Sequence, residues 1–270
     1  MELALPAFPS EPWPQAAFLA VVILVIAGLA MLIFPATSGR LLGLESRQTR
    51  AGGIGEIRAA GGFLAGFAAA ALMFFDQPVL VTALGVAVGV AAFARIISLM
   101  SDTSASLLNF LLLIVQAIFA VVMLTFFFDV VTPDMVLGIP TEAMARLVFF
   151  TFAAVAVIGF LILFAPRIAM SAAGLWVTPE RPGGIASVRS TGGFLLGVGL
   201  FGMAIAGLWE SGFVIFLMLC FGFAAALVLS IVGRIIALVL NRGNLVFGAI
   251  ALLVQAAAAV VVILYVSSAM

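Results

Sequence analysis

Residues 52–66 read GGIGEIRAAGGFLAG, and residues 183–197 read GGIASVRSTGGFLLG, so nine of these 15 positions are identical at a constant offset of 131. Farther along, RII at 95–97 recurs at 234–236 and VQA at 115–117 recurs at 254–256, both at an offset of 139. Ordered matches of Arg, Gln and paired Gly carry more weight than matches of Leu, Val and Ala in such an apolar chain. They predict an internal duplication, with repeats over 17–128 and 145–266 and a linker over 129–144.

The composition places both repeats in a membrane. Hydrophobic residues make up 66% of the 270 residues and charged residues 8%, with a mean hydropathy of +1.41, against about 45–50% and about 25% in soluble domains. Soluble and disordered classes are therefore excluded. A bilayer-spanning helix needs about 20 apolar residues, and such segments occupy 16–34, 57–75, 79–100, 106–128, 142–164, 185–209, 212–240 and 244–266.

These segments are continuously apolar, whereas a β-barrel strand alternates over about 10 residues. Pro35 and Pro166 follow the first and fifth segments and should end those helices. The sequence thus predicts an all-α integral membrane protein of eight helices, four in each repeat. An even number of helices gives both repeats the same orientation, which is opposite to the arrangement in inverted-repeat transporters.

Charge predicts which way the protein faces. Every Arg except Arg146 falls on the side of the connections after segments one, three, five and seven. The positive-inside rule puts that side in the cytoplasm and both termini outside. The N-terminus lacks the positive region of a signal peptide, so we interpret the first segment as a retained anchor with an extracytoplasmic tail over 1–16. A composition rich in Ala, Gly and Arg, without Lys, is typical of a GC-rich bacterial genome. Together with the apolar segments, it leads us to expect a protein of the bacterial inner membrane.

The motifs resemble those of a known family. Glu56 and Arg58 followed by Gly61 and Gly62, and then Arg95 near the end of a third helix, are similar to the bacterial domain-of-unknown-function family 4345. That family is a four-helix membrane domain with an acid-x-Arg…Gly-Gly motif and a later Gly-Arg motif. The resemblance implies two tandem copies and no particular activity. The second copy departs from the pattern, since Ser187 replaces the Glu and Asn241 aligns with Asp102.

The sequence lacks the residues of most catalytic and metal sites. It contains no His and no Lys, and Cys220 is the single cysteine, so no metal ligand set, disulfide framework or Schiff-base lysine is expected. It also lacks the common hydrolase, nucleotide-binding and metalloprotease motifs. The formal net charge is zero, which offers nucleic acid no bulk attraction. We expect no catalytic residue, no cofactor and no nucleic-acid partner.

Small residues follow two of the arginines at helical spacing. Arg58 shares a helix face with Gly62 and Gly66, as Arg189 does with Gly193 and Gly197. In the next segments, ladders of small residues end at Arg95 and Arg234. Small residues at this spacing predict close helix packing, which we favour over contact with a ligand. The predicted packing residues are Gly62, Gly66, Gly193 and Gly197.

The arginines need counter-charges. Arg58 and Arg189 fall in a first helical turn, where the helix dipole disfavours a cation by roughly 0.3–1 kcal/mol. Glu56 or Asp102 could compensate in the first half. The second half lacks both acids, so backbone carbonyls, a partner chain or a lipid phosphate should serve there.

One hypothesis is that each half binds a phospholipid or other lipophilic anion between its second and third helices. The N–H groups of Gly183 and Gly184 would assist. The proposed binding residues are Arg58, Arg95, Arg189 and Arg234. Snorkelling or pairing within the chain is an equal alternative. Pairing of both Arg189 and Arg234 with protein acids would remove the hypothesis.

The remaining intramembrane polar residues are Gln116 and Gln255, for which interhelical hydrogen bonds are favoured over substrate contact. The sequence lacks an acidic residue or His at the predicted bilayer midplane, so a proton relay is not expected. The predicted function is a non-catalytic bundle that binds lipid or another lipophile, or a scaffold subunit held by other membrane proteins. The alternative is a small transporter or flippase-like carrier with its pathway between the repeats.

Overall fold

The computed structural model describes residues 6–46, 52–102, 104–130, 138–177, 183–208, 212–241 and 245–269. Within these ranges, eight helices are long and apolar enough to cross a membrane. They are α1 (Pro12–Ile33), α3 (Gly53–Met73), α4 (Pro78–Ser101), α5 (Leu107–Leu124), α7 (Ala143–Phe164), α9 (Gly184–Gly207), α10 (Phe213–Asn241) and α11 (Leu245–Ala269). The predicted helical class and the eight apolar spans are confirmed.

Short elements connect the long helices. They are the helices α2 (Pro35–Leu41), α6 (Phe127–Val130) and α8 (Pro166–Ala173), and the strands β1 (Leu44–Ser46) and β2 (Leu175–Val177). Pro35 and Pro166 directly follow the C-caps of α1 and α7, and each is the first residue of the next short helix, where its missing N–H costs nothing.

Strands β1 and β2 pair antiparallel and join two connections that lie far apart in the sequence. The all-α expectation missed this pair because a strand of three residues shows no measurable periodicity.

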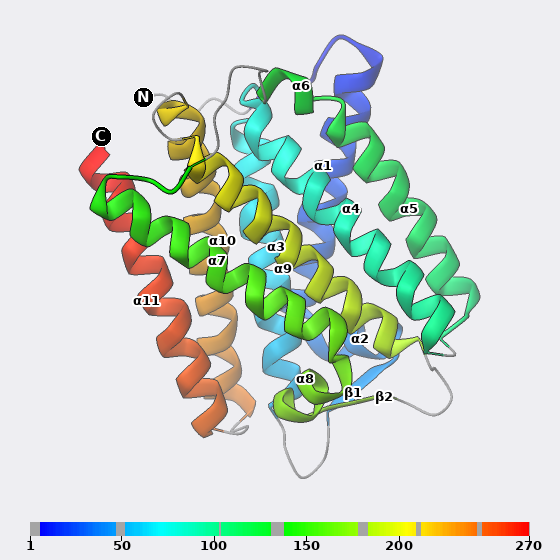
Figure 1. Cartoon of the computed structure of the whole chain (residues 1–270). Coiled ribbons are helices and arrows are strands. Elements are labelled where there is room, and N and C mark those ends of the chain that lie inside the picture. Colours follow the sequence, from blue (N-terminus) through cyan, green and yellow to red (C-terminus); the bar gives the residue numbers. More distant parts are fainter. Residues whose placement is uncertain are drawn as a thin grey trace.

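The long helices form two layers that cross at an angle (Figure 1). In one layer α1 packs on α3, α3 on α10 and α10 on α11; in the other, α7 packs on α9, α9 on α4 and α4 on α5. Each layer therefore takes two helices from residues 17–128 and two from residues 145–266. The two halves are interlocked rather than set side by side.

The core lies between the layers and is rich in aromatic side chains. Phe67, Phe152, Phe216 and Phe223 are fully buried. The rings of Phe152 in α7 and Phe223 in α10 are 4.5 Å apart and connect the layers. In the outer helices α1, α5, α7 and α11, fewer than a third of the residues of the apolar span are buried. Lipid would cover these apolar faces, since hydrocarbon tails are as apolar as Leu side chains.

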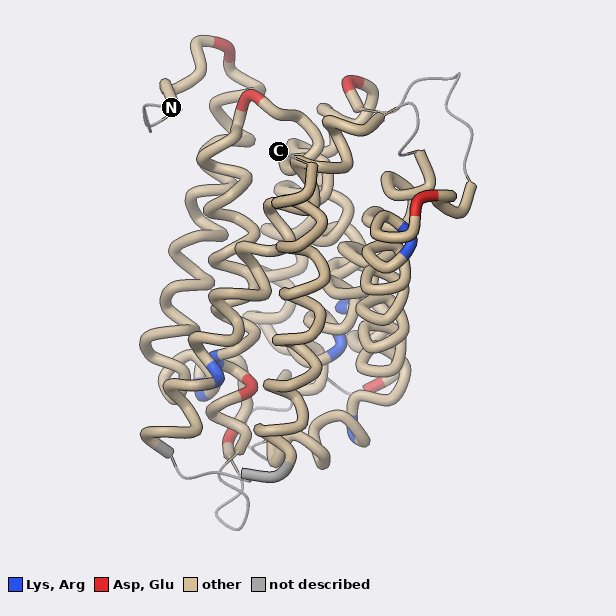
Figure 2. The backbone as a smooth tube through the Cα atoms, turned by 90° about the vertical axis from the view of Figure 1, so that its left-hand side faces the viewer, with Lys and Arg blue, Asp and Glu red and all other residues tan. Residues whose placement is uncertain are grey.

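The two ends of the bundle differ in charge (Figure 2). Helix α1 begins and α11 ends at the same end. Of the described charged residues, that end carries Glu11, Asp76, Asp129, Glu142 and Arg146, and the opposite end carries Arg40, Arg58, Arg95, Arg167, Arg189 and Arg234 together with Glu45, Glu56 and Asp102. Most of the described cations thus gather at the end that also bears α2, α8 and the strands.

Candidate functional site: two arginine clusters between the halves

Glycines on α3 and α9 bring the halves into backbone contact. A Cβ on Gly62 would collide with the carbonyl oxygen of Leu229 in α10, and one on Gly66 would collide with that of Ala225. On the other side, a Cβ on Gly193 would lie 2.6 Å from the carbonyl oxygen of Val90 in α4, and one on Gly197 would lie 2.7 Å from Cα of Ala87. These α3–α10 and α9–α4 contacts, called the glycine contacts below, pack backbone against backbone.

The first arginine cluster lies beside the α9–α4 contact, and Arg95 is at its centre. Arg95 is only 3% exposed. Its Nε donates to Oε1 of Gln116 at 2.9 Å, and its Nη1 donates to Oδ1 of Asn109 at 2.7 Å, both on α5. Nε2 of Gln116 in turn donates to Oγ of Ser190 on α9 at 2.8 Å. Gln116 therefore connects the two halves through a hydrogen bond.

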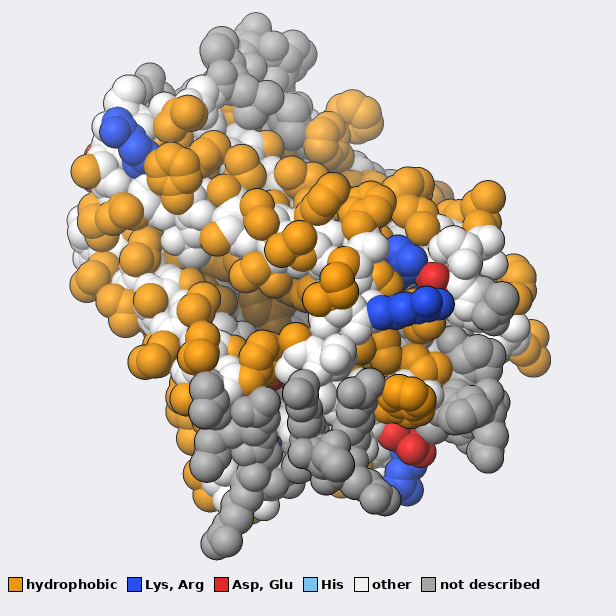
Figure 3. Space-filling model, turned by 60° about the horizontal axis from the view of Figure 1, so that its bottom comes forward, with side chains coloured by type: hydrophobic (Ala, Val, Ile, Leu, Met, Phe, Trp, Pro, Cys, Tyr) orange, Lys and Arg blue, Asp and Glu red, His pale blue; other side chains and the backbone are white. Residues whose placement is uncertain are grey.

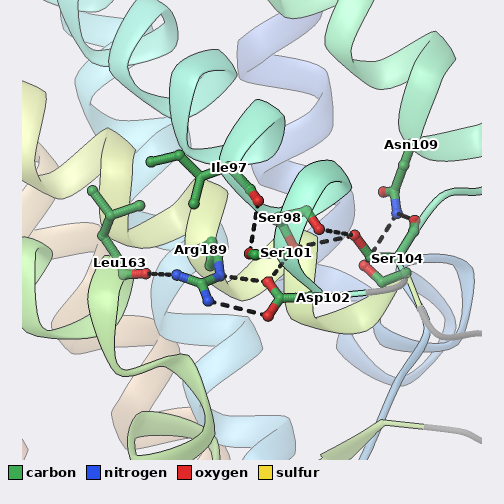
Figure 4. Close-up of polar contacts among 9 residues, drawn as sticks. Ile97, Ser98, Ser101, Asp102, Ser104, Asn109, Leu163 and Arg189 are labelled. Carbon is green, nitrogen blue, oxygen red and sulfur yellow. Dashed lines mark hydrogen bonds and ion pairs between the residues drawn. The ribbon is translucent and has the colours of Figure 1, made fainter.

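Arg189 completes this cluster (Figure 4). Its Nε and Nη2 donate to the two carboxylate oxygens of Asp102, at 2.6 and 3.1 Å. Its Nη1 donates to the carbonyl oxygen of Leu163 at 2.6 Å, and Oγ of Ser98 also donates to Asp102, at 2.8 Å. The first cluster is thus Arg95, Asp102, Asn109, Gln116, Arg189 and Ser190.

The second cluster, beside the α3–α10 contact, repeats the bond between an arginine and a glutamine. Nε of Arg234 donates to Oε1 of Gln255 at 3.0 Å, and Nη2 donates to Oε2 of Glu56 at 2.8 Å. Nη1 of Arg234 donates to Oε1 of the same carboxylate. Nε2 of Gln255 donates to Oγ of Ser230 at 3.0 Å. Together with Arg58, which precedes the glycines on α3, these residues form the second cluster.

The ion pairs correct the expectation for the second half. Its arginines use the acids of the first half: Arg189 pairs with Asp102 and Arg234 with Glu56. Both are paired with protein acids, so the hypothesis of a lipid anion at Arg189 and Arg234 does not hold. The expectation was wrong because it assumed that each half supplies its own partners, whereas the halves are interlocked.

The predicted place of the anion is also corrected. Helices α3 and α4, and likewise α9 and α10, contact each other little, because the glycine contacts join α3 to α10 and α9 to α4. The start of α9 is covered as well: a Cβ on Gly184 would collide with the carbonyl oxygen of Gly43, and Nδ2 of Asn109 lies 3.5 Å from the carbonyl oxygen of Gly183. The second and third helices of one half therefore do not enclose an anion site.

The named clusters retain an excess of positive charge. Each contains two arginines and one carboxylate: Arg95 and Arg189 with Asp102, and Arg58 and Arg234 with Glu56. Arg95 is bound by neutral amide oxygens. Nε of Arg58 is buried, and the described residues provide no hydrogen-bond partner for it. Of the four arginines, Arg58 is thus the one that receives neither a carboxylate nor an amide oxygen from the described residues.

Glu56 and Asp102 were predicted as counter-charges, but only for arginines of their own half. The partners that were not predicted are Leu163, Ser190 and Ser230. A signal for part of this network was present, since a Gln follows the third-helix arginine by 21 residues in both halves. The serines and the Leu163 carbonyl carry no such signal. Their role depends on which helices become neighbours.

Asp102 lies directly after α4 and makes the first cluster sensitive to acid. Burial raises the pKa of this carboxyl group, but the hydrogen bonds from Arg189 and Ser98 and the charges of Arg189 and Arg167 outweigh it and hold the pKa below its usual 3.8. A carboxyl group whose pKa is lower in the folded than in the unfolded protein contributes stability at pH values above its unfolded-state pKa. This contribution is lost as the pH falls through the folded-state pKa.

We therefore expect the thermal stability of the protein in detergent to fall as the pH is lowered from 5 toward 3. The Asp102→Asn variant should lack this component, so the difference between the two proteins should shrink with acidification. Thermal unfolding followed by circular dichroism at several pH values checks this. A constant difference would contradict a role for the Asp102 carboxylate.

No group of three or more His, Cys, Asp or Glu side chains in the described residues could hold a metal ion. Comparisons of the chain with protein-family models, with curated proteins and with solved structures found no match.

Proposed function

We propose that this protein is a non-catalytic bundle of the bacterial inner membrane that binds a lipid or similar lipophile with an anionic headgroup. The observation that carries the proposal is the positive excess of the two clusters, at the end of the bundle where most of the described cations lie. A guanidinium cannot lose its proton and is costly to bury without a counter-charge. At the depth of lipid headgroups, phosphate is the abundant anion.

The proposal includes two four-helix repeats of the same orientation, similar to the family named above. The helix contacts support these repeats, because each contact has a counterpart formed by the equivalent helices of the other half. The contact α1–α3 corresponds to α7–α9, α4–α5 to α10–α11, and α3–α10 to α9–α4. The gathering of cations at one end supports a cytoplasmic location for that end by the positive-inside rule. Both termini would then be extracytoplasmic.

Close packing favours a fixed bundle over the carrier alternative. A pathway between the repeats would have to pass the glycine contacts, where backbone atoms already touch. A hollow with apolar side chains on its walls opens instead on the face seen in Figure 3. Such a surface suits an acyl chain or an apolar helix of another subunit, so the scaffold role remains part of the proposal.

Purification in a mild detergent, followed by mass spectrometry of the extracted lipids, tests the function. We expect anionic phospholipid to be enriched over its proportion in the host membrane, by at least one molecule per chain. Retained lipid with the composition of the bulk membrane would overturn lipid binding. Stoichiometric co-purification of another membrane protein without such enrichment would favour the scaffold role.

A further inference from the structure

Arg58 and Arg189 occupy matching places in the two copies of the 15-residue motif, but their partners differ. Nε and Nη2 of Arg189 donate to both oxygens of Asp102. Nε of Arg58, the matching atom, is buried and unpaired within the described part of the chain. The two clusters thus differ at this position, as they also do at the third-helix arginine, where Arg95 binds Asn109 and Arg234 binds Glu56.

The sequence explains the difference. The position that matches Asp102 at the offset of 139 is Asn241, which is neutral. Glu56 is the acid closest to Arg58 in the sequence, and both of its oxygens accept from Arg234. Glu56 is the one carboxylate among the residues of the second cluster, and Arg234 binds both of its oxygens, so Arg58 has no carboxylate partner within this cluster.

The position of Arg58 limits which anion can replace the carboxylate. It lies in the second turn of α3, not in the first turn that the sequence predicted, because α3 begins at Gly53. This part of α3 lies at the end of the bundle where α2, α8 and the strands meet the helices. A planar guanidinium binds two oxygens of one group side by side, and both carboxylate and phosphate have this geometry. Phosphate is the most abundant group of this geometry at headgroup depth, and a phosphodiester carries the same single negative charge as Asp102.

We propose that a phosphate group occupies at Arg58 the place that Asp102 holds at Arg189, with phosphate oxygens accepting from the guanidinium. We expect one such site in each chain, because Asp102 already occupies the corresponding place beside Arg189 in the first cluster. This inference rests on the proposed function and narrows it to a phosphate-bearing ligand and to one residue. The phosphate belongs either to an anionic lipid or to a soluble phosphate.

The test uses the full chain in detergent, titrated with phosphatidylglycerol, with diacylglycerol as the lipid that lacks phosphate and with inorganic phosphate as the soluble anion. Bound lipid is counted by native mass spectrometry, and thermal unfolding is measured in parallel. We expect the wild type to bind one phosphatidylglycerol in preference to diacylglycerol. Arg58→Gln should weaken that binding about tenfold or more, the size of a lost pair of charged hydrogen bonds.

Two reciprocal variants make the test specific. Asn241→Asp introduces an acid at the sequence position that corresponds to Asp102, so we expect it to displace the phospholipid and to raise the unfolding temperature without lipid. Asp102→Asn frees Arg189, so it should add a second phosphatidylglycerol. Arg40→Gln removes an exposed cation at the same end and is the matched control, for which we expect wild-type binding.

The outcomes separate this inference from the proposed function. Wild-type affinity in both Arg58→Gln and Asn241→Asp overturns the Arg58 site, even where phospholipid remains enriched. If the protein shows no lipid preference and inorganic phosphate has no effect, both the Arg58 site and the proposed lipid-binding function are overturned. Protection by inorganic phosphate that depends on Arg58, without preference for phosphatidylglycerol, supports the phosphate site and identifies its ligand as soluble.

Discussion

The double variant Gly62→Ala/Gly193→Ala is expected to lose the largest part of its stability of any conservative change in this protein. Each added methyl group would meet a carbonyl oxygen of the facing helix, of Leu229 in one case and of Val90 in the other. Overpacking of this kind costs about 1–3 kcal/mol per site. Because the two glycines pack against different helices, the costs should approximately add. Unfolding of the purified protein by denaturing detergent measures the sum.

Gly89→Ala is the matched control. It also lies in a long helix, but a Cβ there would be 3.6 Å from its nearest neighbour, Cβ of Ala120, which is ordinary contact. The substitution should be neutral or slightly stabilising, since Ala is the better helix former by about 1 kcal/mol. Equal losses for Gly89→Ala and Gly62→Ala would show that the glycine contacts do not require glycine.

Glu56→Leu is expected to destabilise the protein by about 3–5 kcal/mol, the cost of leaving one member of a buried ion pair alone. Arg234 is 6% exposed, so its charge cannot reach the headgroups without a rearrangement of α10. Replacement of both members by apolar residues of similar volume is often neutral. The double variant Glu56→Leu/Arg234→Leu should therefore be much more stable than Glu56→Leu alone.

A double-mutant cycle on Glu56 and Arg234 measures this coupling from four unfolding curves. It also tests the interlocked arrangement, because Glu56 lies in the first half and Arg234 in the second. Additive effects of the two single substitutions would mean that the two side chains do not interact in the folded protein. The loss of the Arg234 bond to Gln255 is common to the single and double Arg234 variants and cancels in the cycle.

The partners of the polar residues could be predicted from the sequence only in part. The sequence indicated Arg95 and Arg234 as anion-binding residues and Gln116 and Gln255 as intramembrane polar residues. The structure pairs Arg95 with Gln116 and Arg234 with Gln255. The sequence also assigned Glu56 and Asp102 to arginines of their own half. Offsets between repeats show which residues correspond, but they contain no information on which copy packs against which.

The sequence by itself determined the eight apolar helices, their breaks at Pro35 and Pro166, and the two copies of the arginine and glycine motif. These follow from local chemistry, since hydrocarbon length, proline geometry and helical spacing act within a single segment. Only the tertiary structure decided that α3 packs on α10 and α9 on α4, that Asp102 and Glu56 pair with arginines of the other half, and that no acid of the described residues pairs with Arg58. Those choices depend on contacts between segments more than 80 residues apart, which arise when the layers assemble and which local pattern cannot encode.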